Sequence, residues 1–270
     1  MAEPTADGAG RIEAAFRAAS ERGAAALMPY LMAGFPDDET ARRVAEAYVE
    51  AGADLIEIGV PFSDPLADGP VIHAAATHAL EGGAGMASAM AACRAVSERV
   101  PVVVLCYANM ALADQDAFVD ELVAAGAAGA IVPDLPLEEA VELRRRFEGA
   151  GLALVPLVAP TTTAERRRAI AEAATGFVYI VSTTGTTGER ATMDPRLTEL
   201  VESVRSEASV PVAVGFGVSS PEQAAEVGQV ADGVIIGSRL VRAIDEADGA
   251  DAAVQAVSRL VDESAVALAR

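Results

Sequence analysis

The sequence predicts an α/β protein that folds as a closed (β/α)8 TIM barrel with an extra helix at its N-terminus. Three observations lead to this prediction: eight short apolar runs, amphipathic segments that alternate with them, and glycine-rich turns after the last three runs. Eight strands that alternate with helices over about 250 residues are typical of such a barrel. An open doubly wound sheet has the same local pattern, but the first run is followed by no dinucleotide-binding fingerprint, which favours the barrel.

Each apolar run is short enough to be a strand, and each intervening segment repeats its apolar residues at helical spacing. The predicted strands are Ala26–Met32, Asp54–Val60, Pro101–Tyr107, Gly129–Asp134, Ala153–Val158, Gly176–Ser182, Pro211–Gly215 and Gly233–Gly237. The predicted helices are Gly10–Arg22, Asp38–Ala51, Met86–Arg99, Asp114–Ala125, Leu137–Ala150, Thr163–Ala174, Pro195–Ser206, Pro221–Val227 and Ala250–Ala267.

Polar residues at several helix starts support these boundaries. Asp38, Thr163, Asp194 and Ser220 are of the types that cap the first turn of a helix, and Pro221 suits the first helical position. No linker or low-complexity segment divides the chain. We therefore expect a disordered extension over residues 1–8 and a single barrel domain over residues 9–270.

The composition excludes several classes of function. The formal net charge of −20 disfavours binding to nucleic acids or to anionic membranes, and no run of 18 apolar residues predicts a membrane span. All 20 basic residues are arginine, so no lysine is present to form a Schiff base with a substrate or with pyridoxal phosphate. His73 and His78 cannot form a multi-histidine metal site alone, so no metal is expected. Cys93 and Cys106 lack redox or metal-ligand spacing and favour a cytoplasmic location.

The segment from Asp54 to Pro70 is the most informative part of the sequence. Alternation along a strand places Leu55, Glu57 and Gly59 on one face and apolar residues on the other, so both faces are mostly apolar. Glu57 is therefore predicted to be a buried acid near the C-terminal end of a strand. Burial disfavours the charged form of a carboxyl group and raises its pKa, which suits an acid catalyst. A structural, hydrogen-bonded acid is the alternative interpretation.

In a barrel of this type, the functional site lies at the C-terminal ends of the strands. Six polar residues are predicted at this end of the barrel: Glu57, Asp64, Asp68, Tyr107, Asp134 and Tyr179. Asp68 lies in a proline-rich loop and is expected to stay ionised, unlike Glu57. Taken singly, Asp68 before a glycine is also typical of a turn, and the two tyrosines are also typical of a core.

Three glycine-rich turns follow the last three predicted strands. Glycine allows backbone N–H groups to approach a ligand, and the N-terminus of a following helix favours an anion. Loops after the seventh and eighth strands are a recurrent phosphate site in these barrels. We therefore predict that Gly188, Gly217, Gly237 and Ser238 bind one phosphate group, although each glycine alone could simply make a tight turn.

The segment Glu57-Ile58-Gly59-Val60-Pro61-Phe62-Ser63-Asp64-Pro65-Leu66-Ala67-Asp68-Gly69-Pro70 closely resembles the signature of the tryptophan synthase alpha chain family. The resemblance extends over about residues 10–270. It includes the segments Pro29–Pro36, Tyr107–Asn109, Val132–Pro136 and Gly215–Gln223.

The resemblance implies a lyase that reversibly cleaves indole-3-glycerol phosphate to indole and glyceraldehyde 3-phosphate in tryptophan biosynthesis. It also implies an α2β2 complex in which the beta chain carries pyridoxal phosphate, so no cofactor is expected in this chain. A stand-alone lyase that releases indole, and a non-catalytic partner that regulates a beta chain, are the alternative functions.

The resemblance also implies roles for individual residues. Glu57 resembles the acid and base that moves protons at indole C3 and at the glycerol hydroxyl. Asp68 resembles the carboxylate that pairs with the indole N–H. Tyr179 resembles the tyrosine that lies beside this glutamate. The residues expected to shape the indole pocket are Tyr30, Leu105, Tyr107 and Ile235. Those expected at the partner interface or in loop closure are Asp64, Pro65 and Asp134.

Four positions depart from the common family pattern. In the loop after the sixth strand, Thr183 replaces an arginine and Thr186 replaces a valine. Met32 stands where threonine is common, and His73 stands where glutamine is frequent.

Overall fold

The computed structural model describes residues 7–181, 195–215 and 217–269. Within these residues, nine parallel strand segments form one sheet in the order β5-β4-β3-β2-β1-β9-β8-β7-β6. The segments are β1 (Ala26–Met32), β2 (Ile56–Gly59), β3 (Val102–Leu105), β4 (Gly129–Ile131), β5 (Ala153–Val155), β6 (Leu157–Val158), β7 (Val178–Val181), β8 (Val212–Gly215) and β9 (Gly233–Ile236).

The two ends of this sheet are parts of one predicted strand. Pro156 separates β5, which pairs with β4, from β6, which pairs with β7. Proline has no N–H group to donate to a neighbouring strand, so it interrupts the ladder at this point. The eight predicted strands are therefore all present, and the fifth of them closes the barrel in two short pieces.

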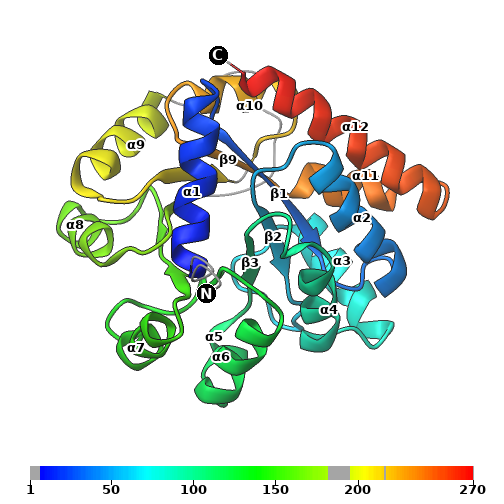
Figure 1. Cartoon of the computed structure of the whole chain (residues 1–270), viewed down its shortest axis with the longest axis horizontal. Coiled ribbons are helices and arrows are strands. Elements are labelled where there is room, and N and C mark those ends of the chain that lie inside the picture. The colour runs from blue at the N-terminus through cyan, green and yellow to red at the C-terminus, as the bar shows by residue number, and fades with distance from the viewer. Residues whose placement is uncertain (1–6, 182–194, 216, 270) are drawn as a thin grey trace, which may run out of the picture.

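Helices surround the sheet (Figure 1). Their bounds are α1 (Gly8–Glu21), α2 (Asp38–Glu50), α3 (Pro70–Glu81), α4 (Met86–Val96), α5 (Ala108–Ala111), α6 (Gln115–Ala124), α7 (Val141–Gly149), α8 (Ala164–Ala173), α9 (Pro195–Glu207), α10 (Pro221–Gly228), α11 (Ser238–Asp245) and α12 (Ala250–Leu268). The nine predicted helices are present with small shifts at their ends. Helices α3, α5 and α11 are additional, and each follows directly on a loop at the C-terminal end of a strand.

The helix caps agree with the sequence at two positions and differ at one. The side chains of Thr163 and Ser220 accept hydrogen bonds from the backbone N–H groups of Arg166 and Gln223. The cap of α2 is Asp37 rather than the predicted Asp38, because the Asp37 carboxylate accepts the Thr40 N–H at 2.8 Å. Asp194 lies outside the described residues.

Helix α1 covers the end of the barrel opposite the predicted site. Its residues Ile12 and Phe16 belong to the apolar cluster of the barrel interior, together with residues at the starts of the strands. Arg11 donates hydrogen bonds to the backbone oxygens of Gly126, Ser97 and Val100. Asp7 caps this helix and Gly8 is its first residue, so α1 begins within the segment predicted as an extension. This end of the barrel is filled by apolar side chains, which leaves the opposite end for a functional site.

A second and larger apolar cluster lies between the strands and the outer helices. It is built mainly from alanine, valine, leucine and isoleucine, as the composition requires. Helix α12 packs against α2 and α10, and α11 packs against α3 and β1. The strands are thus buried on both faces, as parallel strands usually are.

Candidate active site

Glu57 lies inside the barrel, as the alternation along its strand predicts. It is the second residue of β2, its side chain is 1% exposed, and Leu55 on the same face belongs to the interior cluster. Register pairs Glu57 with Tyr30 on β1 and with Val103 on β3. Its Oε2 atom is buried and has no hydrogen-bond partner among the residues that the structure describes. The carboxyl group therefore keeps one oxygen free to contact a bound molecule.

Burial raises the pKa of Glu57 from an ordinary value of 4.5 to about 8, and the negative charge of Asp68 adds to this rise. A carboxyl group with this pKa is largely protonated at neutral pH. It can therefore donate a proton to a substrate, and afterwards accept one as a base.

Asp68 lies near Glu57 although eleven positions separate them in the sequence. The loop between β2 and α3 returns over the end of the barrel, and α3 begins two residues after Asp68, with Pro70 as its first residue. The pKa of Asp68 is raised above its ordinary value, because burial outweighs the Tyr107 hydroxyl and the charge of His73, which both lower it. The expectation that Asp68 stays ionised took no account of this burial. The Tyr107 hydroxyl and the charge of His73 favour the ionised form of Asp68 and so oppose the effect of burial.

Two glycines make room for tyrosine rings in the barrel. A Cβ atom on Gly59 would lie 2.0 Å from the hydroxyl oxygen of Tyr30, and one on Gly215 would lie 2.3 Å from that of Tyr179. Any larger residue at Gly59 or Gly215 would displace the ring that passes over it. Burial of the Tyr179 side chain raises its pKa, and the negative charges of Glu57 and Asp68 add to this rise. Tyr179 therefore lies beside the acid pair.

Tyr30 also belongs to this group of side chains. Its pKa is raised by burial and by the neighbouring charges of Asp68 and Glu57, and its hydroxyl contacts the Met32 sulfur at 4.0 Å. The structure therefore brings together the predicted residues Glu57, Asp68, Tyr30, Tyr107 and Tyr179.

The remaining residues predicted for the indole pocket also face the interior. Ile235 on β9 belongs to the interior cluster, and Leu105 at the end of β3 packs against it. Together with the tyrosines they give the site an apolar and aromatic lining.

Asp134 caps the short helix α5 with its side chain. Its Oδ1 atom accepts the Ala108 N–H at 2.8 Å, directly after Tyr107. The sequence did not predict α5, because a single helical turn carries no periodic signal. The carboxylate that follows β4 thus fixes the backbone that follows β3.

The loop after β2 carries the two residues predicted for the partner interface. Asp64 is exposed, Pro65 is partly exposed, and Leu66 between them and Asp68 is 86% exposed. Leu66 is thus the most exposed of the large apolar side chains that the structure describes.

Two residues of the predicted phosphate site lie at the N-terminus of α11. Gly237 caps this helix and Ser238 is its first residue, and the Cβ position of Gly237 is 3.7 Å from the Tyr30 Cβ. Gly217 is exposed and has φ +91°, a conformation that favours glycine. It follows β8, which pairs with β9, so the two turns leave neighbouring strands. Gly188, Thr183 and Thr186 lie outside the described residues.

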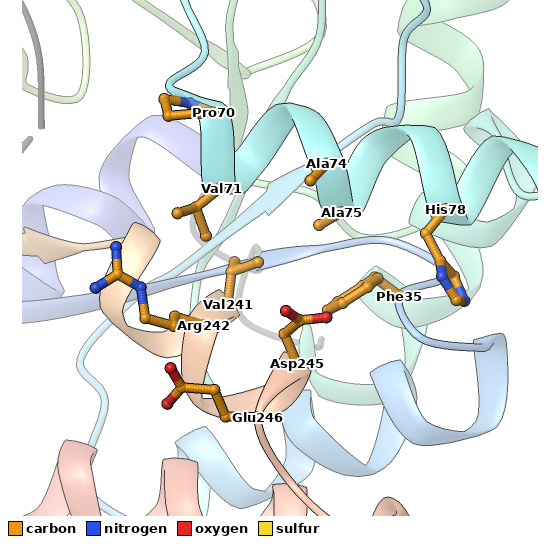
Figure 2. A pocket seen from close by; sticks show the side chains of 10 residues that line it. All are labelled: Phe35, Pro70, Val71, Ala74, Ala75, His78, Val241, Arg242, Asp245 and Glu246. Carbon is orange, nitrogen blue, oxygen red and sulfur yellow. The ribbon is translucent and has the colours of Figure 1, made fainter.

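A separate pocket of about 540 Å³ lies between α3 and α11 (Figure 2). Phe35 closes its floor and stacks edge-on against His78, with ring centroids 5.4 Å apart. Arg242, Asp245 and Glu246 line the α11 side. None of the carboxyl groups and tyrosines described above lines it. His73 and His78 are both exposed residues of α3.

Within the described ranges, no cluster of three histidine, cysteine or acidic side chains has the arrangement of a metal site. Over the same ranges, none of the helices combines the length and the apolar character needed to cross a bilayer.

Sequence reasoning missed two contributors to the site. Phe62 stacks on the Tyr107 ring with centroids 5.1 Å apart, and the Ala67 N–H donates to the Tyr107 hydroxyl at 3.2 Å. The role of Phe62 could have been predicted from the sequence, since it is an aromatic residue in a loop of small and polar ones. The Ala67 contact could not have been predicted, because a backbone N–H donor is independent of the residue type.

The fold and the site define a class: TIM-barrel proteins with a buried glutamate and a half-buried aspartate among tyrosines at the C-terminal end of the barrel. The model of the family described as "Tryptophan synthase alpha chain" matches residues 16–268. The chain therefore belongs to the tryptophan synthase alpha chain family.

Individual relatives agree with this assignment. The tryptophan synthase alpha chain of Synechococcus elongatus is 44% identical over 235 residues, which cover 86% of this chain and 88% of the relative. That of Prochlorococcus marinus is 46% identical and covers 86% of each chain. A solved structure of Mycobacterium tuberculosis tryptophan synthase is similar with a TM-score of 0.89 at 40% identity, covering 96% of this chain and 98% of the other.

Proposed function

We propose that Glu57 and Asp68 carry out the alpha reaction of tryptophan synthase, the reversible cleavage of indole-3-glycerol phosphate to indole and glyceraldehyde 3-phosphate. The chain is a lyase of tryptophan biosynthesis by its family. The observation that carries the residue assignment is the buried Glu57 carboxyl group, with a raised pKa and one unpartnered oxygen.

Cleaving the bond between indole C3 and the glycerol chain requires a group that accepts the bonding electrons. The chain has no lysine for an imine, but a protonated indole ring is itself an electron acceptor. In this proposal neutral Glu57 donates its proton to C3, and the ring becomes cationic. The Glu57 carboxylate then removes the proton of the glycerol hydroxyl, the C–C bond breaks, and its electrons return to the ring. An aldehyde and neutral indole result.

Asp68 supplies the charge that stabilises the cationic ring. A carboxylate beside the indole N–H attracts the positive charge that develops there, and the apolar surroundings strengthen this attraction. The contacts of Asp68 with Tyr107 and His73, which favour its anion, support this role. Glu57 and Asp68 thus take opposite roles, the first as neutral acid and the second as anion.

The phosphate group of the substrate is proposed to bind at Gly217, Gly237 and Ser238, with Gly188 as a fourth contact. Backbone N–H groups at the start of α11 provide a positive potential without a basic side chain. The proximity of Gly237 to Tyr30 supports a single substrate that reaches from this helix to the acid pair.

The family implies a partner beta chain. We propose that the beta chain carries pyridoxal phosphate, because this chain has no lysine with which to bind that cofactor. The exposed segment with Asp64, Pro65 and Leu66 is the proposed contact, in an α2β2 complex.

The test is a turnover assay of the purified chain with indole-3-glycerol phosphate, followed by the release of indole, with and without a beta chain. Release that increases with the beta chain supports the proposal. Full activity from the isolated chain would instead support a stand-alone lyase. A chain that never releases indole, yet activates the beta chain, would support a regulatory partner.

A further inference from the structure

Tyr107 contacts the loop that carries Asp68 at three places. Its ring stacks on Phe62 near the start of the loop, at a centroid distance of 5.1 Å and an interplanar angle of 26°. Its hydroxyl accepts the N–H of Ala67, the residue before Asp68, at 3.2 Å, and it lies close enough to the Asp68 carboxylate to lower its pKa. Between these contacts, Ser63, Asp64 and Leu66 are exposed. One side chain therefore holds both ends of an otherwise outward-facing loop.

The position of Tyr107 is itself fixed. It follows β3, is 1% exposed, and caps α5, whose first backbone N–H is bound by Asp134. A loop anchored to so rigid a side chain loses less conformational freedom when a substrate arrives, and its carboxylate is already oriented.

We propose that Tyr107 is the positioning residue for Asp68, holding the backbone at Ala67 next to this carboxylate through its hydroxyl and the start of the loop through its ring. This inference rests on the proposed function, in which Asp68 stabilises the cationic ring. It gives Tyr107 a role beyond lining the indole pocket, because the hydroxyl acts on a catalytic group rather than on the substrate.

The electrostatic surroundings of Asp68 define what the hydroxyl contributes. Within the described part of the chain, Asp68 interacts electrostatically with five groups: Glu57 on β2, Tyr30 on β1, Tyr179 on β7, His73 on α3 and Tyr107 itself. Among them, only Tyr107 and His73 lower the pKa of Asp68. Removing the Tyr107 hydroxyl should therefore raise the pKa of Asp68, since a hydrogen bond to the charged form is lost.

The test is Tyr107→Phe, which keeps the stacked ring and removes only the hydroxyl. We expect kcat for indole release to fall about tenfold or more while KM changes less than about threefold, because the loss affects the transition state. The acid limb of the kcat profile should move to higher pH by about one unit. In an Asp68→Asn background, the same change should cost less than about twofold, because a residue that acts through Asp68 has nothing left to position.

Tyr48→Phe is the matched control. Tyr48 is equally buried and donates one hydrogen bond, to the Tyr30 backbone oxygen at 3.0 Å. Its variant should lower the melting temperature like Tyr107→Phe without moving the pH profile. An additive loss in the Asp68→Asn background, or the same change of kcat in both phenylalanine variants, would overturn the inference.

A direct readout separates this inference from the proposed function. Carbon-13 NMR of the Asp68 carboxyl group reports its pKa whether or not the chain turns over. A higher pKa in Tyr107→Phe than in the wild type supports the inference, and an unchanged pKa overturns it. A wild-type chain that releases no indole with its beta chain would overturn the proposed function only.

Discussion

At the scale of single residues, burial distinguishes Glu57 from the other acids. Among the residues that the structure describes, it is the one acidic side chain that counts as buried, in a chain with 40 acids. This position was predictable, because strand alternation placed Glu57 on an apolar face. The neighbourhood of Tyr30, Tyr179 and Asp68 was not derivable from spacing, because it depends on which strands become neighbours.

The raised pKa of Glu57 leads to a prediction about pH. Because burial favours the neutral acid, donation of a proton to indole C3 is available below the pKa and is lost as the pH rises through it. Cleavage should therefore fall as the pH rises through about 8, as measured by initial rates of indole release at saturating substrate. A rate that falls instead above pH 4.5 would mean that Glu57 is not the acid.

The same shift affects stability. The unfolded chain ionises Glu57 above its ordinary pKa of 4.5, whereas the folded chain does so only above about 8. Folding is therefore opposed increasingly between these two pH values. Glu57→Gln should be more stable than the wild type near pH 8, by up to a few kcal/mol, and should lose that advantage near pH 4. Urea unfolding at both pH values measures this difference.

Asp68→Asn tests the counter-charge. The amide keeps the shape of the carboxylate but cannot stabilise a cationic indole, so turnover should fall by about a hundredfold with little change in substrate affinity. Wild-type kinetics in this variant would reassign Asp68 to shaping the loop before Gly69.

At the scale of elements, the strands were predicted better than the short helices. All eight predicted strands occur, but four of them end one to three residues earlier than predicted, because Val60, Tyr107, Asp134 and Gly237 lie beyond the last ladder pair. The interruption at Pro156 had a signal, since proline in a strand blocks pairing. Helix α11 was missed because its first residues were interpreted only as a glycine turn. Sequence alone cannot show that such a turn continues into a helix.

The N-terminus of α11 allows a test of the phosphate site. Aspartate suits a helix cap, so Gly237→Asp should leave the fold intact while its charge repels a phosphate dianion. Gly237→Asn is the matched control with the same bulk and no charge. We expect glycerol phosphate to bind at least about tenfold more weakly to the aspartate variant than to the asparagine variant, by isothermal titration calorimetry. Equal affinities would place the phosphate elsewhere.

At the scale of the whole molecule, the barrel divides structure from chemistry. Helix α1 lies across one end of the barrel (Figure 1), where Ile12 and Phe16 join the apolar interior. Glu57 and the loop with Asp68 belong to the strand ends on the other side. The sequence predicted this division, since closed barrels keep their sites at the C-terminal ends of the strands. It could not predict how far the loop with Leu66 extends outward.

That loop leads to a prediction about assembly. Replacing Asp64 and Pro65 with alanine should weaken binding of a beta chain by about tenfold or more and reduce its stimulation of indole release, because a partner that orders this loop also orders Asp68. Binding is measured by titration with the beta chain. A complex of unchanged affinity would mean that the contact lies on another surface.

The central claim is that the buried Glu57 carboxyl group transfers the protons of the cleavage, and Glu57→Gln tests it most directly. Glutamine resembles the neutral carboxyl group in shape, so the variant should fold and bind glycerol phosphate within about tenfold of the wild type. Release of indole from indole-3-glycerol phosphate should fall by about a hundredfold or more, with and without a beta chain. Near-normal turnover in a folded Glu57→Gln chain would contradict the account.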